Sequence, residues 1–239
     1  VYKGVYATDE DVPVNPLTGE RLRMGGNTST QAYFKAGDPI WVDVNGDYII
    51  DEKDKVIVGN SQPRMTGGIS INLRYKAFSI NTNCSFTLRR DIINKALADR
   101  FRAYGTPVAG KVDLTGSGAL TPIEAYNFWT EDNIYAQYPN PFDYTRSSII
   151  QPFRYDQTLF MEDGSYFKIN GISVAYTIPK KMLDFFRLSR CQLNFSMNNI
   201  YTFSKYSGIN PENVNNLGYD TSGGYPNGRT VTFGVSMDF

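Results

Sequence analysis

One stretch of the sequence carries oxygen ligands at a spacing that can hold a metal ion. The twelve residues "DVNGDYIIDEKD" (43–54) match a twelve-residue calcium loop, which binds Ca²⁺ through its positions 1, 3, 5, 7, 9 and 12. These positions are held by Asp43, Asn45, Asp47, the carbonyl of Ile49, Asp51 and Asp54. The sequence therefore predicts a structural Ca²⁺ or similar ion here, with a polar Asx turn as the alternative.

Two positions of this loop depart from the calcium pattern. Tyr48 stands at position 6, where glycine usually supplies a positive φ, and a residue with a Cβ costs roughly 1 kcal/mol more there. Asp54 replaces the bidentate glutamate of position 12, and the flanking sequence predicts no helices. With or without an ion, we expect the loop to act as a structural clip.

The composition argues against several other kinds of functional site. The chain of 239 residues has no histidine, which excludes triads and zinc sites that use imidazole. Lys and Arg total 24, as do Asp and Glu, and this balance argues against a nucleic-acid partner. Glu162 and Asp163 are adjacent carboxylates beside Gly164, a pattern that favours a solvated turn over the two carboxylates of a glycosidase. We therefore expect no enzymatic activity.

An aromatic group in a long connection offers a candidate ligand contact. Tyr126, Phe128 and Trp129 follow the segment "DIINKALADRFRAY" (91–104), whose apolar residues have helical spacing and predict a short helix. Aromatic rings in an exterior loop can stack on sugar rings, or they can pack against one another. Both alternatives stay open, and we treat these three residues as candidate substrate contacts.

The elements that must position these groups are β-strands. Five segments alternate apolar and polar side chains with period two, at about 67–75, 77–89, 166–179, 190–203 and 229–239. Their polar stripe consists mainly of Ser, Thr, Asn and Gln, whereas a soluble sandwich usually carries Lys and Glu there. A hydrated lumen on that side and lipid on the other explain this pattern better than bulk water does.

Connection lengths support the same architecture. Tight turns alternate with long loops at about 8–63, 90–165 and 204–228, as in outer-membrane barrels with short periplasmic turns and long extracellular loops. Aromatic residues near strand ends fit the lipid–water interfaces, namely Tyr176, Tyr201, Phe203 and Phe239. We therefore predict an all-β, antiparallel, up-and-down transmembrane β-barrel wall with a periplasmic C-terminus.

Four features of the sequence match one known family of proteins: the stretches 36–80 ("AGDPIWVDVNGDYIIDEKD" and onward), 162–181 and 198–212, and the terminal Phe239. In these features the chain resembles the C-terminal region of SusC/RagA-like TonB-dependent outer-membrane transporters of Bacteroidota. The resemblance implies a barrel of about 22 strands filled by an N-terminal plug. Residues 1–239 are then the last part of that barrel wall, and we expect the plug, the TonB-contacting segment and the other strands to lie outside this sequence.

The resemblance also implies a function. Transporters of this kind take up oligosaccharides or peptides with a SusD-like lid lipoprotein, energised by TonB with ExbB and ExbD. One alternative is a soluble, calcium-clipped β-sandwich acting as a carbohydrate-binding module. A sandwich would bury Phe86, Phe195 and Phe233 together between two stacked sheets, whereas a membrane wall would leave their face uncovered in the isolated chain.

Overall fold

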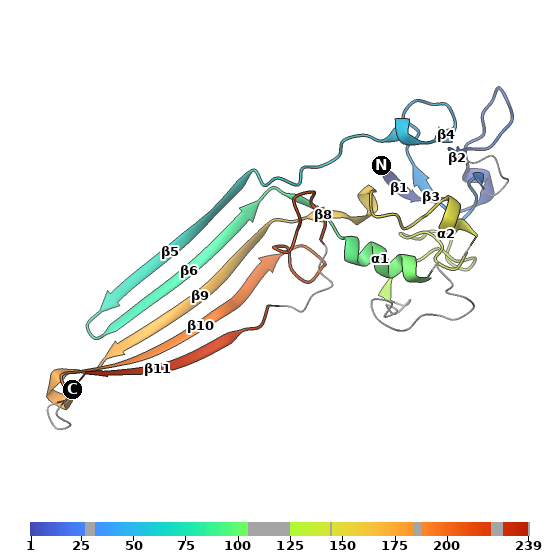
Figure 1. Ribbon diagram of the computed structural model, residues 1–239. Helices are drawn as coiled ribbons and strands as arrows, with labels where there is room; N and C mark the ends of the chain where they lie inside the picture. The colour runs from blue at the N-terminus through green and yellow to red at the C-terminus, as the bar shows by residue number, and fades with distance from the viewer. Residues whose placement is uncertain (27–31, 105–124, 144, 184–187, 221–226, 239) are drawn as a thin grey trace. The chain divides into compact units, whose positions relative to one another are not determined.

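The protein forms two compact units. The computed structural model describes residues 1–26, 32–104, 125–143, 145–183, 188–220 and 227–238 (Figure 1). Unit 1 comprises residues 1–59, 93–161 and 219–223, and unit 2 comprises residues 60–92, 162–218 and 224–239. Each unit therefore combines segments that are far apart in the sequence.

Unit 2 is built on one five-stranded antiparallel sheet (Figure 1). Its strands are β5 (Met65–Tyr75), β6 (Phe78–Leu88), β9 (Tyr166–Thr177), β10 (Arg190–Ser204) and β11 (Thr230–Asp238). Their spatial order is β11-β10-β9-β6-β5, so neighbours in the sheet follow one another along the chain. Each strand lies on a segment where alternation predicted one. In the described part of the chain, β5 and β11 are the edges of an open sheet.

The two ends of this sheet differ in the length of their connections. At the turn end, Lys76 and Ala77 join β5 to β6, and Lys76 takes a left-handed φ of 52°. The β9–β10 connection at the same end is also short and contains α3 (Lys180–Leu183). At the opposite end, which we call the loop end, the chain leaves β6 at Leu88 and returns only at Tyr166.

A β-bulge changes which side chains of β9 face each side. Asn170 is an extra residue, because the partners of β6 step directly from Gly171 to Ile169. Simple alternation would put Lys168 on the same face as Ile172. The bulge reverses that phase, as bulges do, and places Lys168 on the polar face.

Unit 1 consists of short elements around two hydrophobic cores. Its strands are β1 (Tyr2–Val5) with β3 (Pro39–Trp41), antiparallel, and β2 (Arg23–Met24) with β4 (Ile49–Ile50), parallel. Its helices are η1 (Asp9–Asp11), η3 (Glu52–Asp54), α1 (Lys95–Tyr104), α2 (Arg146–Ile149) and η6 (Thr158–Phe160). Much of the chain expected to form loops at 8–63 and 90–165 thus folds into a unit with its own cores.

The first core of unit 1 joins both halves of its sequence. It comprises Tyr6, Val12, Leu22, Phe34, Trp41, Ile50 and Ile150. Beside it, Arg146 of α2 forms a buried ion pair with Asp38, and it also donates to the carbonyl of Tyr33 at 2.7 Å. Because both charged side chains are almost fully buried, each serves as the counter-ion of the other.

The predicted helix begins later than its apolar pattern indicated. Asn94 precedes α1, and its side-chain oxygen accepts the N–H of Leu97 at 3.0 Å, which is the bond of an N-cap. Residues Asp91–Ile93, expected within the helix, instead form β7, which pairs with β8 (Met161–Asp163). None of the helices in the described ranges is long and apolar enough to cross a membrane.

Candidate functional site

One face of the five-stranded sheet is apolar across its full width. The central row comprises Leu73, Ile80, Val174, Phe195 and Phe233, which are register partners from β5 to β11. The rows on either side comprise Tyr75, Phe78, Tyr176, Leu193 and Val235, and Ile71, Thr82, Ile172, Met197 and Val231. Pairing in this register keeps the apolar stripes of all five strands on the same side.

This apolar face is exposed. Phe233 is 78% exposed, Leu73 59% and Val235 55%. The rings of Phe195 and Phe233 lie 5.0 Å apart, but they are neighbours on adjacent strands rather than partners across two sheets. In the described part of unit 2 no second sheet covers this face, so the unit does not form the sandwich of the alternative.

The opposite face carries neutral polar side chains. A hollow of about 530 Å³ is lined by two neighbouring polar rows of β5, β6, β9 and β10. Its polar side chains are Asn72, Arg74, Ser79, Asn81, Ser173, Asn194 and Ser196. Nearer the loop end, the Ser70 hydroxyl donates to the side-chain oxygen of Asn83 at 2.8 Å. This face offers hydroxyl and amide groups to water or to a polar ligand. Arg74 is the one charged side chain that lines the hollow.

The predicted interface aromatics lie near both ends of the apolar face. Tyr176, near the turn end, packs on Phe78 with ring centroids 4.6 Å apart. Tyr201 and Phe203, near the loop end of β10, are half exposed and meet edge to face at 4.6 Å. Phe239 lies outside the described residues. Contact of these rings with lipid headgroups stays a prediction.

In unit 1, the calcium-like loop is held by hydrogen bonds from its backbone N–H groups to its own carboxylate side chains. Asp43 accepts the N–H groups of Gly46 at 2.7 Å and Tyr48 at 2.8 Å, and Asp47 accepts that of Ile49 at 2.9 Å. Tyr48 has a φ of 60°, so the chain adopts the left-handed conformation that position 6 of a calcium loop requires even without glycine. The backbone therefore follows the predicted loop.

The other predicted ligands are engaged in the same way. Asp51 accepts the N–H of Lys53 at 2.7 Å, and Asp54 accepts those of Val44 and Asp51 at 2.8 Å each. Asn45 accepts the N–H of Asp47 at 3.1 Å. Within the described ranges, no three Asp, Glu, Cys or His side chains gather in a metal-binding group. Ca²⁺ binding by this loop stays a prediction.

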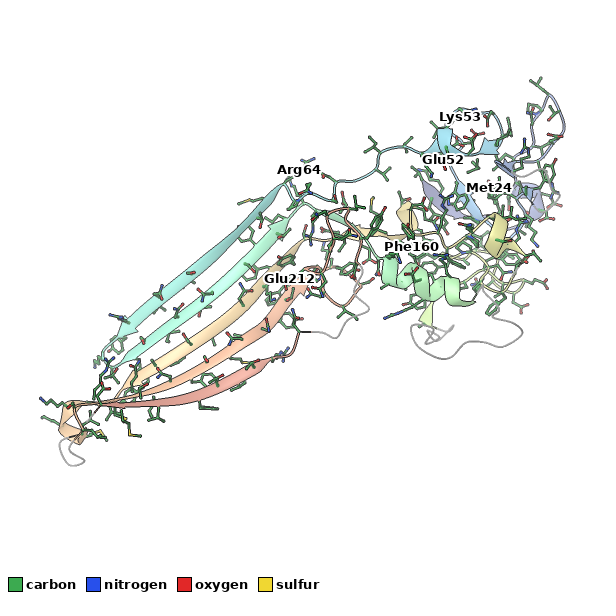
Figure 2. All side chains as sticks on the ribbon, viewed as in Figure 1. Met24, Glu52, Lys53, Arg64, Phe160 and Glu212 are labelled. Carbon is green, nitrogen blue, oxygen red and sulfur yellow. The ribbon has the colours of Figure 1, made fainter. Side chains whose placement is uncertain are left out.

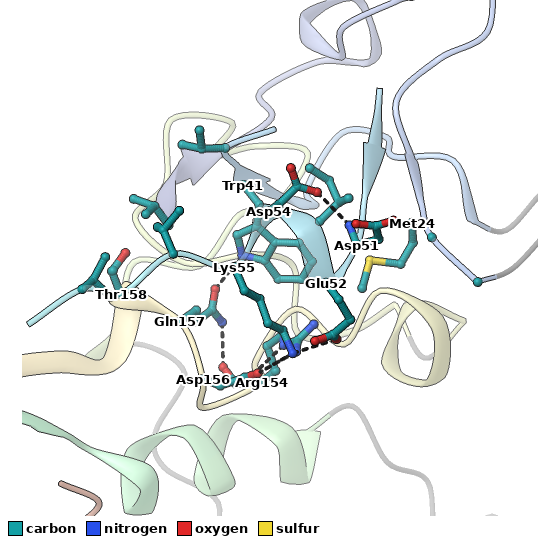
Figure 3. Close-up of a pocket in the computed structure, with 17 residues that line it drawn as sticks. Met24, Trp41, Asp51, Glu52, Asp54, Lys55, Arg154, Asp156, Gln157 and Thr158 are labelled. Carbon is teal, nitrogen blue, oxygen red and sulfur yellow. Dashed lines mark hydrogen bonds and ion pairs between the residues drawn. The ribbon is translucent and has the colours of Figure 1, made fainter. Parts of the chain in front are cut away.

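A hollow of about 390 Å³ in unit 1 lies beside this loop (Figure 3). Trp41 lines it, and its indole N–H donates to Gln157 at 2.8 Å. The sequence pattern did not reveal this hollow, because its walls come from Val1 and from residues within 24–26, 41–42, 50–58 and 154–158, which only folding brings together.

Four charged side chains that line this hollow form ion pairs, namely Glu52, Lys55, Arg154 and Asp156 (Figure 3). Arg154 donates two hydrogen bonds of 2.6 Å to Asp156, which lowers the pKa of that carboxyl below its usual value. Lys55 lies 2.7 Å from Glu52 and 3.9 Å from Asp156. The hollow thus combines an apolar indole with these ion pairs and with the carboxylates of Asp51 and Asp54, which accept backbone N–H groups.

The candidate substrate contacts do not share an exposed surface. Phe128 is 3% exposed and belongs to the second core of unit 1, with Ala98, Phe101, Phe153 and Phe160. Tyr126 packs edge to face on Phe101 at 4.8 Å. Trp129 is half-buried, and its indole N–H donates to the carbonyl of Ala7 at 3.2 Å. For Phe128 the burial favours the second alternative, in which the aromatic rings pack against one another in a local core. Contact of the three residues with substrate stays a prediction.

Comparison with known proteins identifies similar chains. No family model matches the sequence. TonB-dependent receptor P3 of Formosa agariphila is 29% identical over 100% of this chain and 21% of its own length. TonB-dependent receptor SusC of Bacteroides thetaiotaomicron is 22% identical over 92% of this chain and 21% of its own length. The chain thus spans about a fifth of the length of the curated relatives it matches.

Solved structures agree with this similarity. The RagAB peptide importer in the closed-closed state matches with a TM-score of 0.61 and 18% identity, over 100% of this chain and 22% of that one. The open-open state gives 0.58 and 17% over the same share of each chain. The predicted resemblance to SusC/RagA-like TonB-dependent receptors is confirmed, and the structural matches show a shared fold.

Proposed function

We propose that this chain forms part of the wall of a TonB-dependent β-barrel importer in the outer membrane. The observation that carries the proposal is the apolar face, which is continuous across five strands and uncovered within unit 2. Exposed apolar patches of this extent are rare on soluble monomers. Acyl chains can cover such a face, and the opposite polar face then lines the lumen.

The same proposal gives the chain an orientation in the membrane. The short connections at the turn end lie in the periplasm together with the C-terminus, and the long ones lie outside the cell. The backbone groups at the β5 and β11 edges require partners, because lipid offers none. Other strands of a barrel of about 22 strands supply those partners.

The cargo is an oligosaccharide or a peptide, taken up with a SusD-like surface lipoprotein and energised by TonB, ExbB and ExbD. The names of two similar proteins support this proposal: one is the TonB-dependent receptor SusC, and the other is the RagAB peptide importer. The neutral hydroxyl- and amide-lined face suits either cargo.

The experiment uses the complete transporter in its own outer membrane. We expect it to sediment with the outer membrane, to migrate faster on gels before boiling than after, and to be required for uptake of labelled oligosaccharide or peptide. Parallel assays with the two cargo classes identify the substrate. Recovery of the complete protein in the soluble fraction after lysis would contradict the proposal.

We further propose that the 43–54 loop holds Ca²⁺ as a structural clip. The left-handed Tyr48 and the converging Asx turns support this, because they preform the curvature of a calcium loop. Ca²⁺ should slow deuterium exchange in residues 43–54 relative to EDTA, and Asp43→Ala should remove that difference. Equal exchange with Ca²⁺ and EDTA in the unmodified protein would show that the loop is an Asx turn only.

A further inference from the structure

The segment after β10 folds back toward the sheet at its loop end. We call residues 205–218 the return loop, and all of it lies within unit 2. Figure 2 shows one of its side chains, Glu212, beside the loop ends of β9 and β10. A freely projecting hairpin loop would leave its side chains in solvent, whereas Tyr206 and Asn210 are both 8% exposed.

A charged pair ties the return loop to the polar face. Lys168 of β9 is a register partner of Ser85 on β6 and Thr202 on β10, so the bulge places it in a polar row. Its ammonium lies 2.5 Å from the carboxylate of Glu212, and the two side chains are 11% and 25% exposed. The return loop therefore supplies the counter-ion of Lys168.

Two further contacts anchor the same segment. Arg90, just after β6, donates a hydrogen bond to the carbonyl of Pro211. Ser207 donates its N–H and its hydroxyl to the two carboxylate oxygens of Glu162, each at 2.7 Å. The return loop is thus attached to three separate segments of unit 2.

The return loop is also preformed. The side-chain oxygen of Asn210 accepts the N–H of Glu212 at 2.9 Å, an Asx turn that fixes the backbone carrying the carboxylate. The ring of Tyr206 lies against Gly208, where an added Cβ would come within 2.4 Å of it. Glu212 therefore reaches Lys168 from an ordered turn, which lowers the entropy cost of the contact.

We propose that the return loop is a strap, latched over the loop end of the polar face by the Lys168–Glu212 pair, and that its release opens access to this face. This inference rests on the proposed function, in which the polar face lines the lumen and the loop end is its outer mouth. Removing one partner leaves a largely buried charge without its counter-ion, so single substitutions should favour release strongly.

The test uses the complete transporter in outer-membrane vesicles. Glu212→Gln should speed deuterium exchange in residues 205–218 about tenfold or more, since it removes a charge-assisted hydrogen bond. The double variant Lys168→Glu with Glu212→Lys should restore slow exchange. Asp99→Asn, which breaks the more exposed Lys95–Asp99 pair of unit 1, serves as the matched control and should leave the return loop unchanged.

Access is measured separately with an impermeant thiol reagent added from outside. In a background without Cys84 and Cys191, Ser85→Cys places a thiol in the polar row of Lys168. Release of the strap by Glu212→Gln should increase its rate of modification, whereas Asp99→Asn, in the same Ser85→Cys background, should leave that rate unchanged.

Two results would overturn the inference. Unchanged exchange in residues 205–218 of Glu212→Gln would show that no latch exists. Faster exchange without faster modification of Ser85→Cys would show that the segment moves but does not restrict access. Either result leaves the outer-membrane proposal in place, because fractionation and uptake test that proposal independently.

Discussion

A charged side chain placed on the apolar face at mid-membrane should destabilise the folded protein, whereas the same charge on the next residue should have little effect on stability. Ile172 lies on the apolar face of β9, the central strand, and Ser173 lies on the polar face. We predict that Ile172→Arg destabilises the complete transporter in lipid by about 2–4 kcal/mol, whereas Ser173→Arg costs little.

The depth of Ile172 sets this magnitude. It lies roughly midway along β9 between Phe167 and Tyr176, which are near the two ends of the apolar face. A strand that rises about 3.4 Å per residue and tilts by about 40° gains about 2.6 Å of height per residue, so Ile172 lies about 10–13 Å from each. That places it near the centre of an apolar band about 25 Å tall, where the penalty for arginine is greatest.

The assay is refolding of the complete transporter into phospholipid vesicles over a urea series. The folded fraction is read from gel migration before boiling and from protease resistance. A cost of about 2–4 kcal/mol lowers the folding equilibrium constant by roughly 30-fold to 1,000-fold. Phe167→Arg, closer to the interface, should cost only about 0–1 kcal/mol.

The competing expectation is numerically distinct. On a surface exposed to water, Ile172→Arg should change stability by no more than about 0.5 kcal/mol. Equal folding of the Ile172→Arg and Ser173→Arg variants would refute the assignment of the apolar face to lipid. A larger cost for Ser173→Arg would reverse the two faces.

Three further predictions concern unit 1 of the complete transporter. Phe128→Ala leaves a cavity in the second core, so it should lower the opening free energy of unit 1 by about 3–5 kcal/mol, measured by deuterium exchange in α1. Tyr135→Ala removes an exposed ring and should change this free energy by less than about 0.5 kcal/mol. Arg146→Met should cost about 3–5 kcal/mol by the same measurement, because it leaves a buried carboxylate unpaired. The Arg154 hydrogen bonds lower the pKa of Asp156, so they stabilise the folded unit at a pH above the usual carboxyl pKa of 3.8, and this stabilisation is lost as the pH falls below that value. Asp156→Asn should therefore make the thermal stability of unit 1 less sensitive to acid.

Each of these predictions has a contrary outcome. Weaker binding of labelled substrate by Phe128→Ala with unchanged exchange in α1 would support the ligand-stacking role of this ring. A negligible effect of Arg146→Met would mean that water reaches the pair. Identical acid sensitivity with and without the Asp156 carboxyl would assign the pH dependence to other groups.

The sequence alone determined the strands of unit 2 and the character of their faces. Side chains alternate along any extended chain, so the apolar and polar stripes at 67–75 and 190–203 were legible without knowledge of their partners. The alternation of short and long connections likewise predicted the order of strands in the sheet. The calcium-like spacing predicted the turn at Asp43 and Tyr48, although the ion itself stays a prediction.

Tertiary structure decided what depends on partners distant in sequence. The bulge at Asn170 reverses the phase of β9, and only pairing with β6 and β10 shows that Lys168 joins the polar face. Helical spacing predicted α1, but only the folded unit shows that Phe128 packs against it. Periodicity reports the local environment of a side chain, whereas the burial of Phe128 and the partner of Lys168 depend on contacts made across long stretches of chain.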